Sequence, residues 1–317
     1  MLVMNKINDI KQEVKKIIVG QEDLIDSLLV GLIANGHILV EGVPGLAKTT
    51  AINAIAKALG VEFKRIQFTP DLLPSDVTGT EIYNPKSGEF SIKQGPIFTN
   101  LLLADEINRA PAKVQAALLE VMQERQVTIG DQTFKIDEPF LVMATENPVE
   151  QEGTYRLPEA QLDRFMLKVM VGYNTIEEEM EIVERVAIKG FEQVEAVASV
   201  EDLREIREEF KKVHVDDAIK EYMAKIIFAT RFPKEYGVGD VADYISFGAS
   251  PRASIDLYKA SCAVALIRGN DFVTPLDISY IASSVLRHRV ILNYKAQAND
   301  ISTDTVIEKI IQTIKAP

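Results

Sequence analysis

A short glycine-containing stretch, EGVPGLAKTT at residues 41–50, most constrains how this chain can fold. The apolar run HILVE at 37–41 precedes it and predicts a buried strand, and TTAINAIAKAL after it has helical spacing and stops at Gly60. A strand, a glycine loop and a helix in this order are typical of a phosphate-binding loop, in which backbone N–H groups and the positive end of the helix surround an anion. The pattern GxxxxGK[ST] has glycine before the lysine, whereas this chain has Ala47 there.

Alanine at position 47 keeps the backbone N–H but loses the freedom to adopt a positive φ. We expect Ala47 to have φ < 0 at the first turn of the helix, where alanine costs little. Lys48 would reach the β- and γ-phosphates, and the Thr49 hydroxyl would ligate Mg²⁺. A strand-to-helix turn with Gly and Pro is common, so this loop by itself leaves a purely structural role open. The residues expected to bind the nucleotide here are Gly42, Val43, Pro44, Gly45, Leu46, Ala47, Lys48, Thr49 and Thr50.

Two further apolar runs end in polar residues: LLLADE in Asp105 and Glu106, and FLVMATEN in Asn147. The carboxyl ends of parallel strands meet at one edge of a sheet, where open α/β folds bind ligands. We expect Asp105 to hold Mg²⁺ through its water, Glu106 to orient or deprotonate the attacking water, and Asn147 to hydrogen-bond the γ-phosphate or that water. A solvated acidic strand end, or an Asn before Pro in an ordinary turn, is the structural alternative. The combination with the loop favours a functional site.

Apolar runs alternate with helical patterns up to residue 172, and EFKRIQFT and MLKVMVG complete five predicted strands. IYNPKSGEFSIKQGP, with its turn at Pro85–Gly88, and QVTIGDQTFKI read as hairpins. Helical patterns follow, and residues 176–212 contain 12 acidic and 6 basic residues. We therefore predict an α/β domain at residues 1–185, with a parallel sheet covered by helices on both faces, and an all-helical domain at 190–317.

Composition restricts the class of partner. The 35 basic and 47 acidic residues give a net charge of −12, which disfavours nucleic acid and anionic membranes. Cys262 is the sole cysteine, which excludes an intrachain disulfide and suits a reducing compartment. No apolar run approaches the length of about 18 residues needed to span a bilayer, so no membrane insertion is expected. These features predict a cytoplasmic protein, and the scattered histidines give no metal-ligand spacing.

In order along the chain, GVPGLAKT, LLLADEINRAP, ATENP, LPEAQLDRF and SPRA resemble AAA+ ATPases of the MoxR family. The resemblance covers essentially the whole chain and includes hairpins at 79–97 and after the helix at 111–125. Magnesium-chelatase ATPase subunits and replicative helicases share these hairpins, so the MoxR-like assignment depends on EGVPGLAKT, ENPVEQEGTYRLPEAQLDRF and the compact helical lid. The resemblance implies an AAA+ P-loop NTPase core followed by a helical lid. Alanine before the P-loop lysine is common in that family, which implies that the loop works.

The resemblance also implies roles for residues outside the loop. Arg164 corresponds to an arginine finger that is offered to the neighbouring subunit, and Arg252 to a sensor 2 arginine in the lid. Arg109 and Arg156 are competing candidates for the finger. Asp105 and Glu106 correspond to the Walker B pair and Asn147 to sensor 1. The residues in the place where such proteins hold adenine are Ile18, Val19 and Gly20.

The resemblance implies Mg²⁺-dependent hydrolysis of ATP by a self-assembled ring, which is expected to be a homohexamer. The resemblance further implies chaperone-like remodelling of a protein client, with a von Willebrand factor A domain partner, in complex maturation or cofactor insertion. Alternatives are a magnesium-chelatase-type motor subunit, a nucleic-acid motor, and a scaffold that binds nucleotide without hydrolysis. Phosphate release, DNA affinity and the identity of the client distinguish them.

Overall fold

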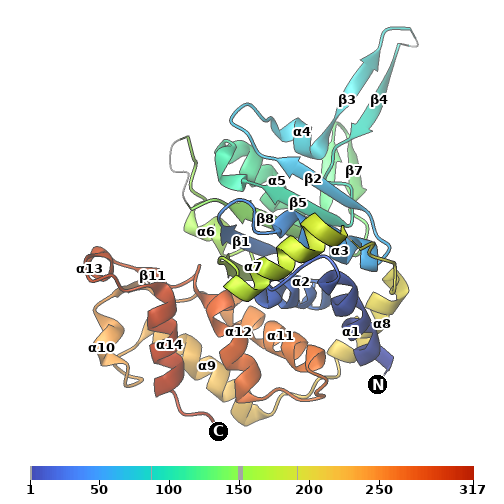
Figure 1. Ribbon diagram of the computed structural model, residues 1–317. Helices are drawn as coiled ribbons and strands as arrows, with labels where there is room; N and C mark the ends of the chain where they lie inside the picture. The colour runs from blue at the N-terminus through green and yellow to red at the C-terminus, as the bar shows by residue number, and fades with distance from the viewer. Residues whose placement is uncertain (1, 87, 149–152, 191) are drawn as a thin grey trace.

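Five parallel strands form the central sheet in the part of the chain that this computed structural model describes, residues 2–86, 88–148, 153–190 and 192–317. Their order across the sheet is β2–β5–β8–β1–β9 (Figure 1). Each overlaps a segment that predicted a strand, and all pairings between them are parallel, so the predicted sheet is confirmed. The bounds are β1 Ile38–Gly42, β2 Phe63–Gln67, β5 Leu101–Asp105, β8 Leu141–Glu146 and β9 Leu167–Val171.

Successive strand residues point to opposite faces of the sheet. Both faces are buried, because each is covered by its own hydrophobic cluster. Leu101 and Leu103 belong to one hydrophobic cluster, which includes residues of α1, α2 and α3. Leu102 and Ala104 belong to a second cluster, which includes residues of α5. The helices of this part are α1 Leu2–Lys15, α2 Glu22–Ala34, α3 Lys48–Ala58, α4 Pro74–Thr78, α5 Ala112–Glu124 and α6 Glu159–Leu162, with a 3₁₀ turn at Ile107–Arg109.

Helix α1 ends at Lys15, five residues before a change in backbone direction signalled by two left-handed residues. Gly20 and Gln21 both take left-handed backbone angles, with φ of 67° and 54°, and the chain reverses there before α2 begins. The segment predicted to hold adenine is therefore a loop between two helices.

Two antiparallel hairpins extend from the sheet, as predicted: β3 Gly79–Asn84 with β4 Glu89–Gln94, and β6 Gln126–Ile129 with β7 Gln132–Lys135. The first projects farthest from the body of the protein (Figure 1) and carries the exposed aromatic pair Tyr83 and Phe90. Its predicted turn at Pro85–Gly88 contains Ser87, which lies outside the described residues.

The chain after β9 is mainly helical, and the predicted helical lid is confirmed; the lid also contains a short antiparallel pair of strands. Thr274 caps α12 by accepting the N–H of Asp277. None of the described helices is long and apolar enough to cross a membrane. The bounds are α8 Val200–Phe210, α9 Asp217–Arg231, α10 Gly239–Ala242, β10 Ile245–Phe247, α11 Pro251–Ile267, α12 Pro275–Leu286, β11 Ile291–Leu292, α13 Tyr294–Ala298 and α14 Thr303–Thr313.

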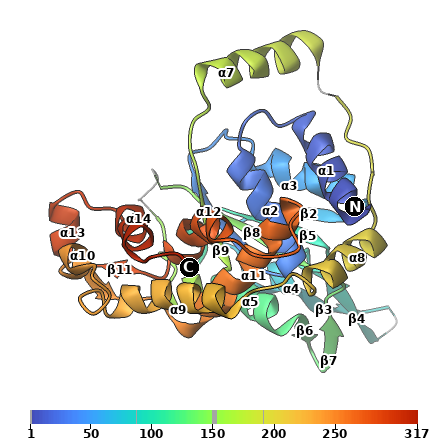
Figure 2. The ribbon, with the colours of Figure 1, turned by 90° about the horizontal axis from the view of Figure 1, so that it is seen from below.

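Between β9 and α8 the chain forms a helix that the sequence did not assign. Helix α7, Ile176–Ile182, continues into a π-helical segment at Val183–Lys189 and lies over α1 and α3 (Figure 2). Thr175 caps it in a reciprocal capping box with Glu178. The predicted domain boundary, between residues 185 and 190, falls at the end of this segment and stays a prediction.

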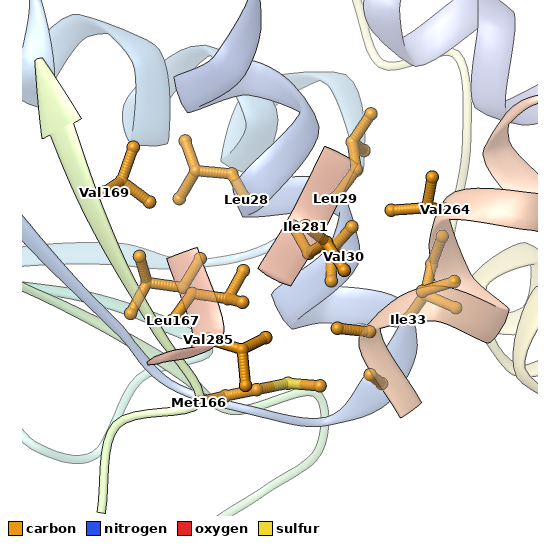
Figure 3. Close-up of a cluster of buried hydrophobic side chains, with 14 of the residues drawn as sticks. Leu28, Leu29, Val30, Ile33, Met166, Leu167, Val169, Val264, Ile281 and Val285 are labelled. Atoms are coloured by element: carbon orange, nitrogen blue, oxygen red, sulfur yellow. The ribbon is translucent and has the colours of Figure 1, made fainter. Parts of the chain in front are cut away.

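The lid packs directly on the α/β core through apolar side chains. Leu28, Leu29 and Ile33 of α2 and Leu167 of β9 cluster with Val264 of α11 and with Ile281 and Val285 of α12 (Figure 3). These side chains are buried. Removal of apolar surface from water stabilises such a contact by roughly 25 cal/mol per Å², so the hydrophobic effect holds the lid on the core.

Candidate nucleotide-binding site

A cavity of about 360 Å³ lies at the carboxyl edge of the sheet, and most of the predicted site residues line it. The loop after β1, the end of β5 and the end of β8 contribute, because these three strands are neighbours. The lining residues are Pro44, Gly45, Leu46, Ala47, Lys48, Thr49, Thr50, Arg65, Asp105, Glu106, Thr145 and Asn147.

The expectation for Ala47 was wrong. Ala47 precedes α3 with φ 53° and ψ 17°, so it lies in the left-handed region and not in the first helical turn. The reason is that α3 begins one residue later, at Lys48, and the loop must turn back on itself to start the helix. A left-handed conformation costs a residue with a Cβ about 1 kcal/mol or more. The alanine variant of this loop is thus a strained one.

The glycines of the loop have different reasons to be glycine. Gly45 has φ 88° with open space around its Cα, which leaves the backbone accessible to a ligand. At Gly42 a Cβ would come within 2.7 Å of the carbonyl oxygen of Val171 on β9. Gly42 therefore serves the close approach of β1 and β9, and neither it nor Val43 lines the cavity.

Lys48 is partly buried and points back into the loop, where its Nζ donates to the carbonyl oxygen of Gly42 at 2.6 Å. Burial lowers the pKa of Lys48, and the nearby carboxylates of Asp105 and Glu106 oppose that shift. An anion in the cavity would stabilise the charged ammonium directly.

Asp105 is held from two sides. Thr145 of β8 donates its hydroxyl to Oδ1 at 2.6 Å, and Arg65 of β2 donates to Oδ2 from Nη2 at 2.6 Å and from Nε at 3.1 Å. Thr145 is buried, whereas the Arg65 side chain is about half exposed. A magnesium ion that used Asp105 would compete with the guanidinium of Arg65.

Glu106 is also held in place, and its backbone is unusual. Its Oε2 accepts from Gln67 Nε2 at 2.8 Å and pairs with Arg109 Nη1 at 3.2 Å. Its backbone N–H donates to Thr145 Oγ1 at 2.9 Å, and its φ is 55°. A non-glycine residue in this region is characteristic of functional sites, where the surroundings enforce the strain.

Sequence reasoning missed Arg65, Gln67 and Thr145. Arg65 and Gln67 stand two residues apart on β2, so they point to the same face, and the register pairs Gln67 with Asp105. A polar pair at i and i+2 near the carboxyl end of a parallel strand was the available signal. Thr145 could not be found in this way, because it requires knowing that β8 lies next to β5.

A second cavity of about 400 Å³ adjoins the first and shares Gly45, Leu46, Ala47 and Thr50 with it. Val19, predicted to contact adenine, lines it together with Ile17, and Ile182 and Val186 of the α7 segment contribute apolar surface. Ile18 is instead buried in the core, where its side chain cannot reach this space. A Cβ at Gly20 would collide with the carboxylate of Glu178, so Gly20 permits close packing of the loop against α7. The apolar walls suit a flat aromatic base.

The two arginines assigned to the transition state lie elsewhere. Arg164 and Arg252 line a cavity of about 240 Å³ between the core and the lid, and neither is among the residues that line the loop cavity. Within the described part of the chain, the exposed side chain of Arg164 has no hydrogen bond or ion pair. Arg252 is 3.6 Å from Asp163.

The competing arginines have other surroundings. Arg109 is paired with Glu106, which lines the loop cavity of the same chain. Arg156 is exposed, and its charge lowers the pKa of Glu146, which burial raises more strongly. Residues 149–152 of ENPVEQEGTYRLPEAQLDRF lie outside the described residues.

The residues of the loop cavity fit a magnesium–nucleotide complex. Thr49 and Asp105, which both line the cavity, carry side-chain oxygens of the kind that Mg²⁺ prefers. Among the described residues there is no cluster of three or more His, Cys, Asp or Glu side chains able to hold a metal. A metal here would therefore depend on the nucleotide phosphates for further ligands, as is usual for Mg²⁺ in nucleotide sites.

Comparison with known proteins agrees with this geometry. Residues 37–167 match the ATPase family associated with various cellular activities (AAA), and residues 239–310 match the AAA lid domain. The chain is 51% identical over 305 residues to Chaperone MoxR1 of Mycobacterium tuberculosis, covering 96% of this chain and 81% of that protein. It is 28% identical over 337 residues to Protein MoxR of Methylorubrum extorquens, covering 97% and 94%.

A crystal structure of a proposed ATPase from Cytophaga hutchinsonii superposes with a TM-score of 0.93 at 52% identity, covering all of this chain and 96% of that one. The same overall fold thus occurs in a protein that shares about half of this sequence. The chain belongs to the MoxR family of AAA+ ATPases.

Proposed function

We propose that the chain hydrolyses ATP in a ring, with each site completed by the neighbouring subunit. One observation carries the proposal: Lys48, Asp105, Glu106 and Asn147 meet in one cavity, while the exposed Arg164 faces a different one. A single chain then holds the nucleotide and the water-activating group in one place and offers its transition-state cation in another.

Within one subunit the loop N–H groups and Lys48 would bind the phosphates, with the base in the apolar cavity beside Val19. Thr49 and Asp105 would hold Mg²⁺, which when bound neutralises phosphate charge. Glu106 would take the proton of the attacking water, and Asn147 would orient that water. Glu106 is suited to this task because its carboxylate is already fixed by Gln67 and Arg109.

From the neighbour, Arg164 would stabilise the charge that develops on the transferred phosphoryl group. Arg252 lines the same cavity as Arg164, so both arginines would face the adjacent subunit together. A closed ring of any size uses one repeated head-to-tail interface, and the number six is proposed from the family resemblance alone.

The work done by hydrolysis would be remodelling of a protein client. Support comes from the name of a relative, Chaperone MoxR1. A client or co-factor protein with a von Willebrand factor A domain, complex maturation or cofactor insertion as the outcome, and a cytoplasmic location stay predictions from the family resemblance.

The test combines two inactive variants. Lys48→Ala should not bind ATP but still offers Arg164, whereas Arg164→Ala should bind ATP but offers no finger. In randomly mixed rings an intact site would meet an intact finger at about a quarter of the interfaces, from the statistics of a repeated heterologous contact. Phosphate release should therefore return on mixing. If it does not, although fluorescently labelled wild-type subunits exchange under the same conditions, the proposal that Arg164 acts between subunits is wrong.

A further inference from the structure

Arg289, which follows α12 in the lid, is a buried cation that neither the loop site nor the arginine cavity explains. Its side chain is 1% exposed, and it pairs with carboxylates from two parts of the molecule. Its Nε donates to Oδ1 of Asp163 in the core at 2.9 Å, and its Nη2 donates to Oδ2 of Asp256 on α11 at 2.5 Å. A buried arginine is costly unless it is fully paired, and this one is.

The same guanidinium also binds backbone on both sides of Arg164. Nη2 donates to the carbonyl oxygens of Asp163 at 3.2 Å and of Phe165 at 2.8 Å, and Nη1 donates to that of Met166 at 3.4 Å. The planar guanidinium carries five N–H donors in a fixed arrangement, which is why one arginine can hold several carbonyl groups of one turn.

Other lid residues converge on the residue that precedes Arg164. Ser250, at the start of α11, donates its hydroxyl to both carboxylate oxygens of Asp163 at 2.9 Å, and Arg252 lies 3.6 Å from Oδ2. Arg164 itself is exposed and lines the cavity together with Arg252 and Asp256. The core holds this turn through the N–H of Met166, which donates to the carbonyl oxygen of His37, and the lid adds the side-chain contacts to Asp163 and to the carbonyl groups beside Arg164.

A merely structural role explains this arrangement poorly. The lid is already attached to the core next to this point by buried apolar side chains, including Leu167 and Val285 (Figure 3). Replacing a buried ion pair by apolar residues is often neutral or stabilising, so attachment alone does not call for a charge here. What an arginine adds is a fixed geometry for the backbone that it binds.

We propose that Arg289 is a positioning residue for Arg164: by holding residues 163–166 it makes the lid set the position from which Arg164 reaches the neighbouring site. This inference rests on the proposed action of Arg164 between subunits. It implies that movement of the lid in one subunit changes the hydrolysis rate in the next, because the turn moves with the lid.

The test uses Arg289→Met in the full-length protein, with Arg287→Met as the matched control. Arg287 is two residues away, pairs with Asp304 and donates to the carbonyl oxygen of Lys168. Within the described part of the chain it makes no hydrogen bond or ion pair with the turn at 163–166. We expect Arg289→Met to bind a fluorescent ATP analogue like wild type but to lose about 10²-fold in hydrolysis, the size of effect that a displacement of about 1 Å can have. The control should retain both properties.

Mixing distinguishes positioning from general damage. Arg289→Met should regain phosphate release with Lys48→Ala, which supplies a well-placed Arg164, but not with Arg164→Ala, since neither partner then offers a positioned finger. Wild-type hydrolysis by Arg289→Met, or equal rescue by both partners, would overturn the inference. If the mixture of Lys48→Ala with Arg164→Ala regains activity while that of Arg289→Met with Lys48→Ala does not, the positioning role alone fails. If the first mixture is also inactive, action between subunits fails with it.

Arg289→Lys guards against loss of folding, because it keeps a cation between Asp163 and Asp256. A lysine ammonium cannot reproduce the bonds to the three carbonyl groups, so hydrolysis should still fall while the melting temperature stays near that of wild type. If Arg289→Lys hydrolyses ATP like wild type, the contacts to the backbone do not matter and the inference is wrong.

Discussion

The loop cavity and the cavity between core and lid differ in how their charges are satisfied. In the loop cavity the charged groups are engaged within the chain: Arg65 binds Asp105, and Lys48 binds the carbonyl oxygen of Gly42. In the junction cavity the carboxylates of Asp163 and Asp256 are taken up by Arg289, which leaves Arg164 exposed without a bonded partner among the described residues.

This difference shows how one chain can keep the nucleotide-binding groups in one cavity and an exposed arginine at another. In the loop cavity, Arg65 and Arg109 neutralise the carboxylates of Asp105 and Glu106. A metal ion that binds Asp105 must compete with Arg65. At the junction, a buried arginine neutralises the acids so that an exposed arginine remains available to another molecule. A bare surface cation contributes little to stability, so its position has to be set by its neighbours.

The largest effect is expected from the junction side. Arg164→Ala should leave ATP binding unchanged and lower the hydrolysis rate by about 10³–10⁵-fold, because its charge acts in the transition state alone. Single-turnover phosphate release and nucleotide affinity measure the two properties. Arg156→Ala is the matched control and should remain close to wild type. If Arg156→Ala shows the larger loss, the finger has been assigned to the wrong arginine.

The next effect belongs to the loop cavity. Glu106→Gln should bind ATP normally and hydrolyse it about 10²–10⁴-fold more slowly, because an amide cannot accept a proton. Asp105 and the loop are untouched, so binding measured by fluorescence should report an intact site. Turnover at the wild-type rate would show that Glu106 is not the general base. The loop cavity would then bind the nucleotide without supplying the group that activates water.

The fold could be predicted from the sequence because its signals are local. Apolar runs located four of the five strands, and EFKRIQFT, in which apolar and polar residues alternate, located β2. The site could be predicted where a residue ends a strand, as Asp105, Glu106 and Asn147 do. These positions follow from the rule that parallel strands present their carboxyl ends at one edge.

What could not be predicted depends on contacts between distant segments or on backbone angles. Arg289 and Asp163 are 126 positions apart, and no local pattern links them. The left-handed angle of Ala47 follows from where α3 begins, and helix boundaries are uncertain by a residue or more in any sequence-based prediction. The α7 segment was missed because the many acidic residues in it weaken the apolar pattern of Ile182 and Val186, which line the second cavity.

A smaller effect is expected from loss of Arg65, the internal counter-ion of Asp105. Arg65→Ala should lower the Mg²⁺ concentration needed for half-maximal ATP binding by roughly two- to fivefold, the value of a half-exposed ion pair. The reason is that Asp105 loses the guanidinium that competes with the metal. Arg204→Ala removes an exposed surface pair with Glu201 and should change nothing. Weaker binding of Mg–ATP by Arg65→Ala would mean that Arg65 contacts the nucleotide instead of competing with the metal.

The smallest effect concerns the strained alanine of the loop. With φ at 53°, Ala47 has a conformation that glycine adopts freely, so Ala47→Gly relieves strain in the folded state. Glycine also gains freedom in the unfolded chain, which offsets part of this relief. The free energy of unfolding, measured in urea, should therefore rise by no more than about 1 kcal/mol. Nucleotide affinity should stay within roughly tenfold, since the backbone N–H is unchanged.

The control for this prediction is Gly45→Ala in the same loop. Gly45 has φ 88° and open space around it, so an added Cβ meets no neighbour and introduces backbone strain alone. Gly45→Ala should lower the free energy of unfolding by about 1–2 kcal/mol, the cost of a left-handed residue with a Cβ. The two variants thus change the same property in opposite directions at two positions of one loop. A gain of much more than tenfold in nucleotide affinity for Ala47→Gly would show that alanine impairs the native loop. The loop cavity would then limit nucleotide binding in the native protein.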